Sequence, residues 1–159
     1  MINVKSKLIH PNYNTKPYLN DIALLQLSQD LEFNDFIKPI KLSENDKDIE
    51  PSDCKNVEIL VAGWGEAVDE IPNEPYQKLE VKYPKILRKE KLELVDMKAC
   101  KKLWNRTNHI YDDSVICARS LISNIPGTCS GDSGGPLKKV DLNSKEYVAI
   151  GIGKSNFYF

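Results

Sequence analysis

Histidine is scarce in this chain, which has only two among its 159 residues, His10 and His109. Apolar runs are short, and none approaches the roughly 18 residues of a membrane span, so no membrane partner is expected. Charge of one sign is lacking as well, because 22 Lys and Arg nearly balance 23 Asp and Glu. The net charge of −1 gives no electrostatic reason to expect a nucleic acid partner.

Cysteine is also sparse, and its wide spacing matches no zinc pattern, so no metal ion is expected. The four cysteines are Cys54, Cys100, Cys117 and Cys129. An even count in a loop-rich chain favours disulfides, and four cysteines allow three pairings. Disulfides form in oxidising compartments, which predicts a secreted, extracellular protein. The triplet that starts at Asn105 is an N-glycosylation acceptor and agrees with secretion.

A signal peptide is missing from the first residues, MINVKSKLIH, because they contain no continuous apolar segment. A secreted protein needs such a signal. We therefore expect the sequence to begin within a longer protein.

Short apolar segments between turns make up most of the chain. Strands are expected over 22–27, 57–65, 79–84, 114–118, 136–140 and 147–153. The compact apolar run 22–27 is expected to be buried. One helix is expected from Asp96, as N-cap, to Trp104, with Met97, Cys100, Leu103 and Trp104 on one face. Many short strands with one modest helix predict an all-β sandwich or barrel.

The charged segment SENDKDIEPSD (43–53) has a single large hydrophobic residue, Ile49. Such a composition is typical of an exposed connector. We expect residues 1–43 to form one half of the protein, 44–56 the connector, and 57–159 the other half.

The segment GTCSGDSGGPL (127–137) frames a serine with glycines, as expected for a nucleophile in a tight turn. A serine hydroxyl is weak unless a base, usually histidine, takes its proton. The segment also matches the nucleophile elbow of α/β-hydrolases, G-x-S-x-G. That elbow opens a helix, which Gly134-Gly135-Pro136 would do poorly. It also places its histidine after the serine, and no histidine follows Ser133. The α/β-hydrolase interpretation is therefore rejected.

Five sequence blocks, together and in this order, resemble the chymotrypsin-like serine proteases. They are NDIALLQL (20–27), VAGWG (61–65), ACKKLW (99–104), SVICA (114–118) and GTCSGDSGGPL (127–137). The resemblance runs from about Lys7 to about Gly153. HPNYN, NDIALLQL and FIKPIKL together look most like secreted arthropod proteases with an N-terminal clip domain. The resemblance implies an all-β, chymotrypsin-like double β-barrel cut at both ends, with 1–43 as the end of the first barrel and 57–159 as most of the second.

The same resemblance implies a serine endopeptidase that acts on a protein or peptide substrate without a cofactor. It makes Ser133 the nucleophile and Asp21 the aspartate that orients the catalytic histidine. The backbone N–H groups of Gly131 and Ser133 would form the oxyanion hole. Asp132 would pair with the N-terminal amine that zymogen cleavage exposes, and this ion pair would set the oxyanion hole.

The family's catalytic histidine lies in an Ala-Ala-His-Cys block, which this sequence does not contain. We interpret His10, in a stretch that resembles a non-catalytic part of the family, as a turn histidine. His109 lies in a polar loop and is interpreted as non-catalytic too. The activation cleavage site of the family is also absent. The sequence departs from the family's Gly-Ile-Val-Ser-Trp-Gly strand after Gly153, and with a one-residue shift Ser155 and Phe157 would stand in for its Ser-Trp pair. We therefore expect a partial catalytic domain that is not competent by itself.

Disulfide pairing is another property that the resemblance implies. It joins Cys100 to Cys117 and gives Cys129 a partner outside the chain. Cys54 would join an upstream pro-segment or clip domain, because Lys139 occupies the position of its other usual partner.

The specificity pocket of the family has its floor at the position of Gly127, with Thr128 next to it. Trypsin-like enzymes carry an aspartate there, and this chain offers no such charge. An apolar or small substrate side chain is therefore expected.

Two other interpretations stay open. The chain could be a non-catalytic protease homologue that acts as a binding or regulatory module, although intact Ser133, Asp21 and Gly131 argue against lost catalysis. It could also be an incomplete product without a stable fold. Coding sequence upstream of Met1 discriminates among them: an Ala-Ala-His-Cys block supports the enzyme, and a substituted histidine supports the homologue. Absence of upstream coding sequence supports the incomplete product.

Overall fold

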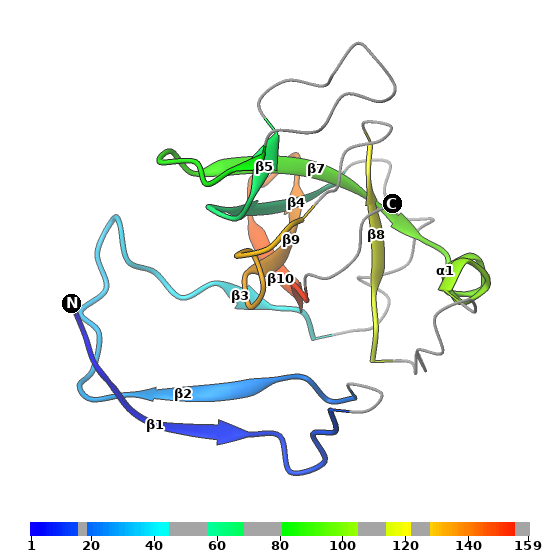
Figure 1. Ribbon diagram of the computed structural model, residues 1–159. Coiled ribbons are helices and arrows are strands. Elements are labelled where there is room, and N and C mark those ends of the chain that lie inside the picture. Colours follow the sequence, from blue (N-terminus) through cyan, green and yellow to red (C-terminus); the bar gives the residue numbers. More distant parts are fainter. Residues whose placement is uncertain (16–18, 45–56, 69–80, 105–113, 122–127, 155–159) are drawn as a thin grey trace. The chain divides into compact units, whose positions relative to one another are not determined.

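The computed structural model describes residues 1–15, 19–44, 57–68, 81–104, 114–121 and 128–154. The chain forms two compact units: Met1–Ile40 with Met97–Ile116, and Lys41–Asp96 with Cys117–Phe159. Most elements along the chain are strands, and the described part contains a single helix (Figure 1). The prediction of an all-β protein is confirmed.

The first unit contains an antiparallel pair of strands, β1 (Val4–Ile9) and β2 (Ala23–Leu27). The predicted strand 22–27 therefore exists, but the prediction that it is buried is wrong. Leu24 and Leu25 are 69% and 62% exposed, although they point to opposite faces. The described sheet has only these two strands, so neither face of β2 is covered within its unit.

The helix α1 (Met97–Trp104) also belongs to the first unit. It begins directly after Asp96, as the N-cap prediction required, and Cys100 on its predicted apolar face is 1% exposed.

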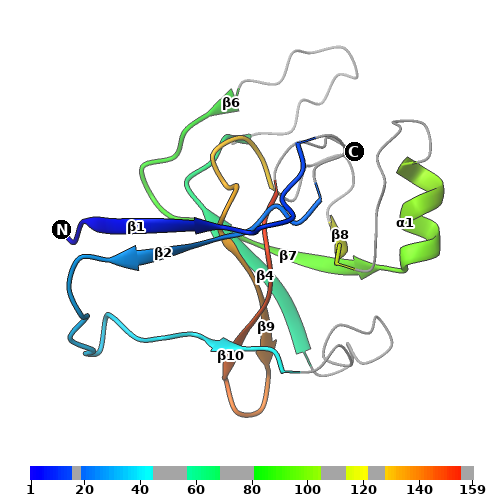
Figure 2. The same ribbon diagram turned by 90° about the horizontal axis from the view of Figure 1, so that it is seen from below.

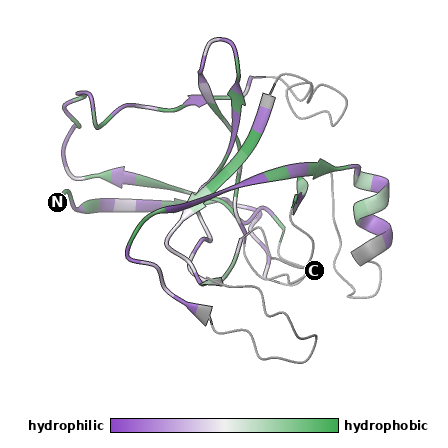
Figure 3. Ribbon diagram, turned by 90° about the horizontal axis from the view of Figure 1, so that it is seen from above, coloured by the Kyte–Doolittle hydropathy of each residue, from purple (hydrophilic) through white to green (hydrophobic). Residues whose placement is uncertain are grey.

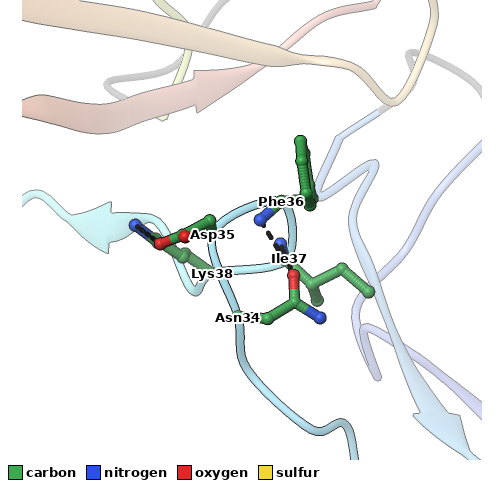
Figure 4. Close-up of polar contacts among 5 residues, drawn as sticks. All are labelled: Asn34, Asp35, Phe36, Ile37 and Lys38. Atoms are coloured by element: carbon green, nitrogen blue, oxygen red, sulfur yellow. Dashed lines mark hydrogen bonds and ion pairs between the residues drawn. The ribbon is translucent and has the colours of Figure 1, made fainter.

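The segment between β2 and the second unit turns at Asn34 (Figure 4). Oδ1 of Asn34 accepts hydrogen bonds from the backbone N–H groups of Phe36 and Ile37, at 2.8 and 3.0 Å. Lys38 and Asp35 form an exposed ion pair at 3.6 Å. An asparagine that bonds to the backbone two and three residues on is a standard turn former, which explains the reversal here.

The second unit is built on a six-stranded sheet with the order β3-β10-β9-β4-β7-β8 (Figure 2). Its strands are β3 (Lys41–Leu42), β4 (Val57–Gly63), β7 (Arg88–Val95), β8 (Cys117–Ser120), β9 (Pro136–Asp141) and β10 (Tyr147–Ile152). All neighbours are antiparallel except β3 and β10, which are parallel. A separate hairpin pairs β5 (Ala67–Val68) with β6 (Val81–Lys82).

Three of the predicted strands, 57–65, 136–140 and 147–153, correspond to β4, β9 and β10. The strand predicted at 114–118 begins later, at Cys117, and only the part of 79–84 after residue 80 is described. The strands β1, β3, β5 and β7 were not predicted.

The core of the second unit is built mainly from the strands of its large sheet, and both faces contribute, because the adjacent Ile59 and Leu60 of β4 are both buried. Its buried hydrophobic residues are Ile59, Leu60, Leu92, Leu94, Cys129, Leu137, Val140 and Ile150. In the part of β7 from Lys91 to Leu94 hydrophilic and hydrophobic residues alternate, as Figure 3 shows on the strand that leads to the helix. Leu92 and Leu94 are buried and the charged residues between and around them are not, because successive side chains point to opposite faces.

Candidate active site

Ser133 lies in the turn that precedes β9, and its side chain is exposed. The turn is closed by two backbone hydrogen bonds, from Asp132 N to Cys129 O and from Gly135 N to Asp132 O, each 3.0 Å long. Gly131 and Gly134 have φ angles of +99° and +84°, in the left-handed region. Glycine adopts this region without the steric cost that other residues meet, so a glycine before and after the serine permits the sharp turn.

Gly131 is constrained by space as well as by its backbone angle. A Cβ atom at this position would lie 3.1 Å from Cα of Gly65, in another turn of the chain. The close approach of the two backbones and the positive φ angle both favour glycine at this position.

The carboxylate of Asp132 is directed into the protein toward the end of β4. Its Oδ1 accepts a hydrogen bond from Gly65 N at 2.8 Å, and its Oδ2 accepts one from Cys129 N at 3.1 Å. A Cβ atom at Gly63 would lie 1.9 Å from Oδ1 of Asp132, and one at Gly65 would lie 2.5 Å from it. These two glycines therefore make room for the carboxylate, a function that their sequence block did not reveal.

Three further backbone hydrogen bonds anchor the turn to two neighbouring segments. Gly134 N donates to Gly153 O at 2.8 Å, and Gly153 N donates to Gly135 O at 2.7 Å, just after β10. On the other side, Glu66 N donates to Ser130 O at 2.8 Å. The backbone around Ser133 is thus held from both sides, which fixes where the serine can point.

Asp21 belongs to the first unit, where it is exposed and follows Asn20, whose φ angle is +53°. The amide of Asn20 donates to the carbonyl of Asn12 at 3.0 Å, and Ile22 N donates to Asn20 O at 2.8 Å. These bonds shape the turn that leads from Asp21 into β2. Ser133 belongs to the second unit, and each residue is placed only within its own unit.

His10 lies in the turn between β1 and β2, where its Nδ1 accepts a hydrogen bond from Asn12 N at 3.2 Å. A ring nitrogen engaged by the local backbone agrees with the interpretation of this residue as a turn histidine.

The cysteines that the structure describes have two chemical states. Cys100 and Cys117 are disulfide-bonded, whereas Cys129 carries a thiol that is 8% exposed. The thiol of Cys129 donates to Oε2 of Glu66 at 3.5 Å.

Several predicted residues lie outside the described part of the chain: Cys54, Asn105, His109, Gly127, Ser155 and Phe157. Thr128, next to the expected pocket floor, is half-buried, and Lys139 lies in β9. Within the described ranges, no group of three or more His, Cys, Asp or Glu residues is arranged to hold a metal ion. The described helix is too short and too polar to cross a bilayer.

Comparison with known proteins gives a consistent result. Residues 1–153 match the family model described as Trypsin. The chain is 33% identical over 161 residues to Phenoloxidase-activating factor 3 of Holotrichia diomphalia, a match that covers 99% of the chain and 38% of the relative. It is 31% identical over 153 residues to the CLIP domain-containing serine protease HP8 of Bombyx mori, covering 95% and 38%. Venom protease of Bombus pensylvanicus is 32% identical over 151 residues, covering 94% and 54%. The chain therefore spans well under two thirds of the length of these relatives.

Proposed function

The chain belongs to the trypsin family, and from this premise we propose that it supplies the nucleophile and the orienting aspartate of a serine endopeptidase. Its strand-rich architecture agrees with the chymotrypsin-like fold of that family. The observation that carries the proposal is the turn of Ser133: an exposed serine between two glycines at positive φ, on a backbone anchored on both sides.

In this proposal Oγ of Ser133 attacks the scissile carbonyl carbon while a histidine takes the hydroxyl proton. The backbone N–H groups of Gly131 and Ser133 stabilise the negative charge on the carbonyl oxygen. The leaving amine departs with the proton from the histidine, and water then hydrolyses the acyl-enzyme. Asp21 holds the histidine in the correct orientation and tautomer.

We propose that the histidine comes from residues outside these 159. His10 and His109 lie outside any Ala-Ala-His-Cys block, and His10 is engaged in a local turn. Without the base, the oxyanion hole and substrate binding give only residual catalysis, so the chain by itself is inactive.

Asp132 is proposed to bind the amine that zymogen cleavage exposes. An ionised carboxylate offers about four acceptor positions. The two backbone bonds seen here leave capacity for an ammonium group on the same carboxylate.

The remaining features of the proposal follow the family resemblance. The substrate is a protein or peptide, with an apolar or small side chain opposite Gly127 and Thr128. The protein acts outside the cell, where Asn105 is glycosylated and Cys54 is bonded to an upstream pro-segment or clip domain. Residues 1–43 belong to the first barrel, 44–56 to the connector and 57–159 to the second barrel.

The test compares the 159-residue chain with the same chain preceded by its own upstream coding residues. Only the longer protein is expected to hydrolyse a chromogenic peptide. Ser133→Ala should lower its kcat by a factor on the order of 10⁶, and Asp21→Asn by roughly 10⁴. Ser28→Ala, at an exposed serine after β2, is the matched control and should leave kcat unchanged.

Hydrolysis by the 159-residue chain that Ser133→Ala abolishes would contradict the claim that this chain is inactive. A longer protein that binds the peptide without cleaving it would instead support a non-catalytic homologue.

A further inference from the structure

Glu66, which directly precedes β5, contacts the turn of Ser133. Its backbone N–H donates to Ser130 O at 2.8 Å. Its Oε1 accepts a hydrogen bond from the hydroxyl of Tyr83 at 3.0 Å, and its Oε2 accepts one from the thiol of Cys129 at 3.5 Å. All of these residues belong to the second unit.

The register of the hairpin explains why Glu66 and Tyr83 meet. Ala67 pairs with Lys82 in the antiparallel ladder, so the next positions outward are Glu66 and Tyr83. Directly opposed side chains of an antiparallel pair lie close enough to interact. The ring of Tyr83 also lies beside the turn, because its Cε1 would be 3.5 Å from a Cβ atom at Gly131.

The carbonyl of Ser130 and the N–H of Gly131 belong to the same peptide group. This group is planar and trans, so the two point in opposite directions. A hydrogen bond that fixes the carbonyl therefore also fixes the direction of the N–H. The constraint matters here because Gly131, at φ +99°, has no Cβ atom to restrict its backbone.

We propose that Glu66 and Tyr83 are positioning residues for the N–H of Gly131. Tyr83 holds the carboxylate of Glu66, which keeps the Glu66 backbone against Ser130 and so keeps the N–H of Gly131 in one orientation. The inference rests on the proposed function, in which this N–H is one of the two oxyanion donors. It assigns the β5–β6 hairpin a part in catalysis without contact with the substrate.

The first test is nuclear magnetic resonance on the 159-residue chain labelled with ¹⁵N. Tyr83→Phe keeps the ring and removes only the hydroxyl. It should shift the amide resonance of Gly131 and speed hydrogen exchange of the Glu66 amide about tenfold. Glu66→Ala should have the same effect, and Glu66→Gln should largely restore the original values because its amide oxygen still accepts from Tyr83.

The matched control is Glu93→Ala on β7. It removes a carboxylate that accepts a hydrogen bond from Nε of Arg119 at 2.9 Å, across the β7–β8 pair. It should leave the Gly131 and Glu66 amides unchanged. Unchanged Gly131 and Glu66 amides in both Tyr83→Phe and Glu66→Ala would overturn the proposal.

The second test uses the longer protein described above. Tyr83→Phe should lower kcat by roughly 10- to 100-fold with KM little changed, because a donor displaced by about 1 Å costs rate rather than ground-state binding. A change in KM alone would overturn the catalytic part of the proposal. Absence of Ser133-dependent hydrolysis in the unsubstituted protein, with the resonance response intact, would overturn the proposed function and leave the positioning of Gly131 supported.

Discussion

Oδ1 of Asp132 accepts a hydrogen bond from the backbone N–H of Gly65 at 2.8 Å, and the two residues are 67 positions apart in the sequence. This bond joins the turn of the proposed nucleophile to the end of β4. The space that the carboxylate occupies is the space that a side chain at Gly63 or Gly65 would need. The hydrogen bond therefore explains why positions 63 and 65 are glycines and why the side chain of Asp132 points inward.

Gly63→Ala is expected to destabilise the second unit. The new Cβ atom would lie 1.9 Å from Oδ1 of Asp132, so the carboxylate must move and lose its bond to Gly65. We expect the free energy of unfolding to fall by about 1–3 kcal/mol, measured by urea denaturation. In an Asp132→Ala background the same substitution should cost at least about 1 kcal/mol less.

Gly134→Ala is the control that separates crowding from backbone strain. A Cβ atom there has no neighbour within 4 Å, but φ is +84°. Its cost, about 1–2 kcal/mol, should be the same with or without Asp132. Equal costs of Gly63→Ala in the two backgrounds would show that the contact with Asp132 is not the cause.

Lys145→Gly is expected to stabilise the hairpin between β9 and β10. Lys145 has a φ angle of +61°, which costs an L-residue about 1 kcal/mol, and glycine adopts it freely. After the larger chain entropy of glycine is subtracted, a gain of about 0.5 kcal/mol should appear in thermal or urea unfolding. Lys145→Ala removes the same side chain but keeps the strain, so a similar gain from that variant would contradict the explanation.

Asp141 is expected to make stability depend on pH in the acid range. Backbone N–H groups of Ser144 and Asn143 hold the pKa of the Asp141 carboxyl below its ordinary value. Because the folded pKa is the lower one, this stabilisation is present above about pH 4 and disappears as the pH falls through the folded pKa. Relative to the Asp141→Asn variant, the natural chain should therefore lose free energy of unfolding as the pH falls below about 4.

Urea unfolding at a series of pH values measures this difference. A pH titration of the Asp141 carboxyl followed by nuclear magnetic resonance gives its pKa. A difference that stays constant from neutral pH to about pH 2 would refute the assignment.

Cys100 and Cys117, both disulfide-bonded, are expected to be linked to each other. Closing that loop stabilises the protein by about 3 kcal/mol in the chain-entropy model, so replacing both with serine should lower the free energy of unfolding by a similar amount. Peptide mapping by mass spectrometry without reduction checks the pairing. A Cys54–Cys129 linkage in a monomer would contradict it, and Cys54→Ser is the control expected to leave the stability unchanged.

Local sequence patterns predicted the elements whose signals are local. Alternation and apolar runs gave β4, β9 and β10, and Asp96 marked the start of α1. The strand β7 was missed because Arg88, Lys89 and Lys91 obscure the two buried leucines, whose spacing of two is the only sign of a strand. Burial of β2 was predicted wrongly because burial depends on what covers a strand, and composition does not contain that information.

Of the proposed site, the sequence predicted only the residues that belong to a recognisable motif. The order of the sequence blocks pointed to Ser133, and the structure places it in the sharp turn that the glycines imply. Glu66, Tyr83 and Gly63 were missed, since their contacts reach residues 17 or more positions away and leave no periodic signal. Gly63 and Gly65 in VAGWG indicate a place where a side chain would not fit. The sequence does not show that the carboxylate of Asp132 occupies that place.

The two-stranded sheet of the first unit has a consequence for how long the protein survives among other proteases. Such a sheet is marginally stable by itself, and exposed leucines on β1 and β2 contribute little burial within their unit. Its strands should open more often than those of the six-stranded sheet, and opened strands are what proteases cut. The lifetime of the chain is therefore set in β1 and β2, far along the sequence from the serine that defines its family.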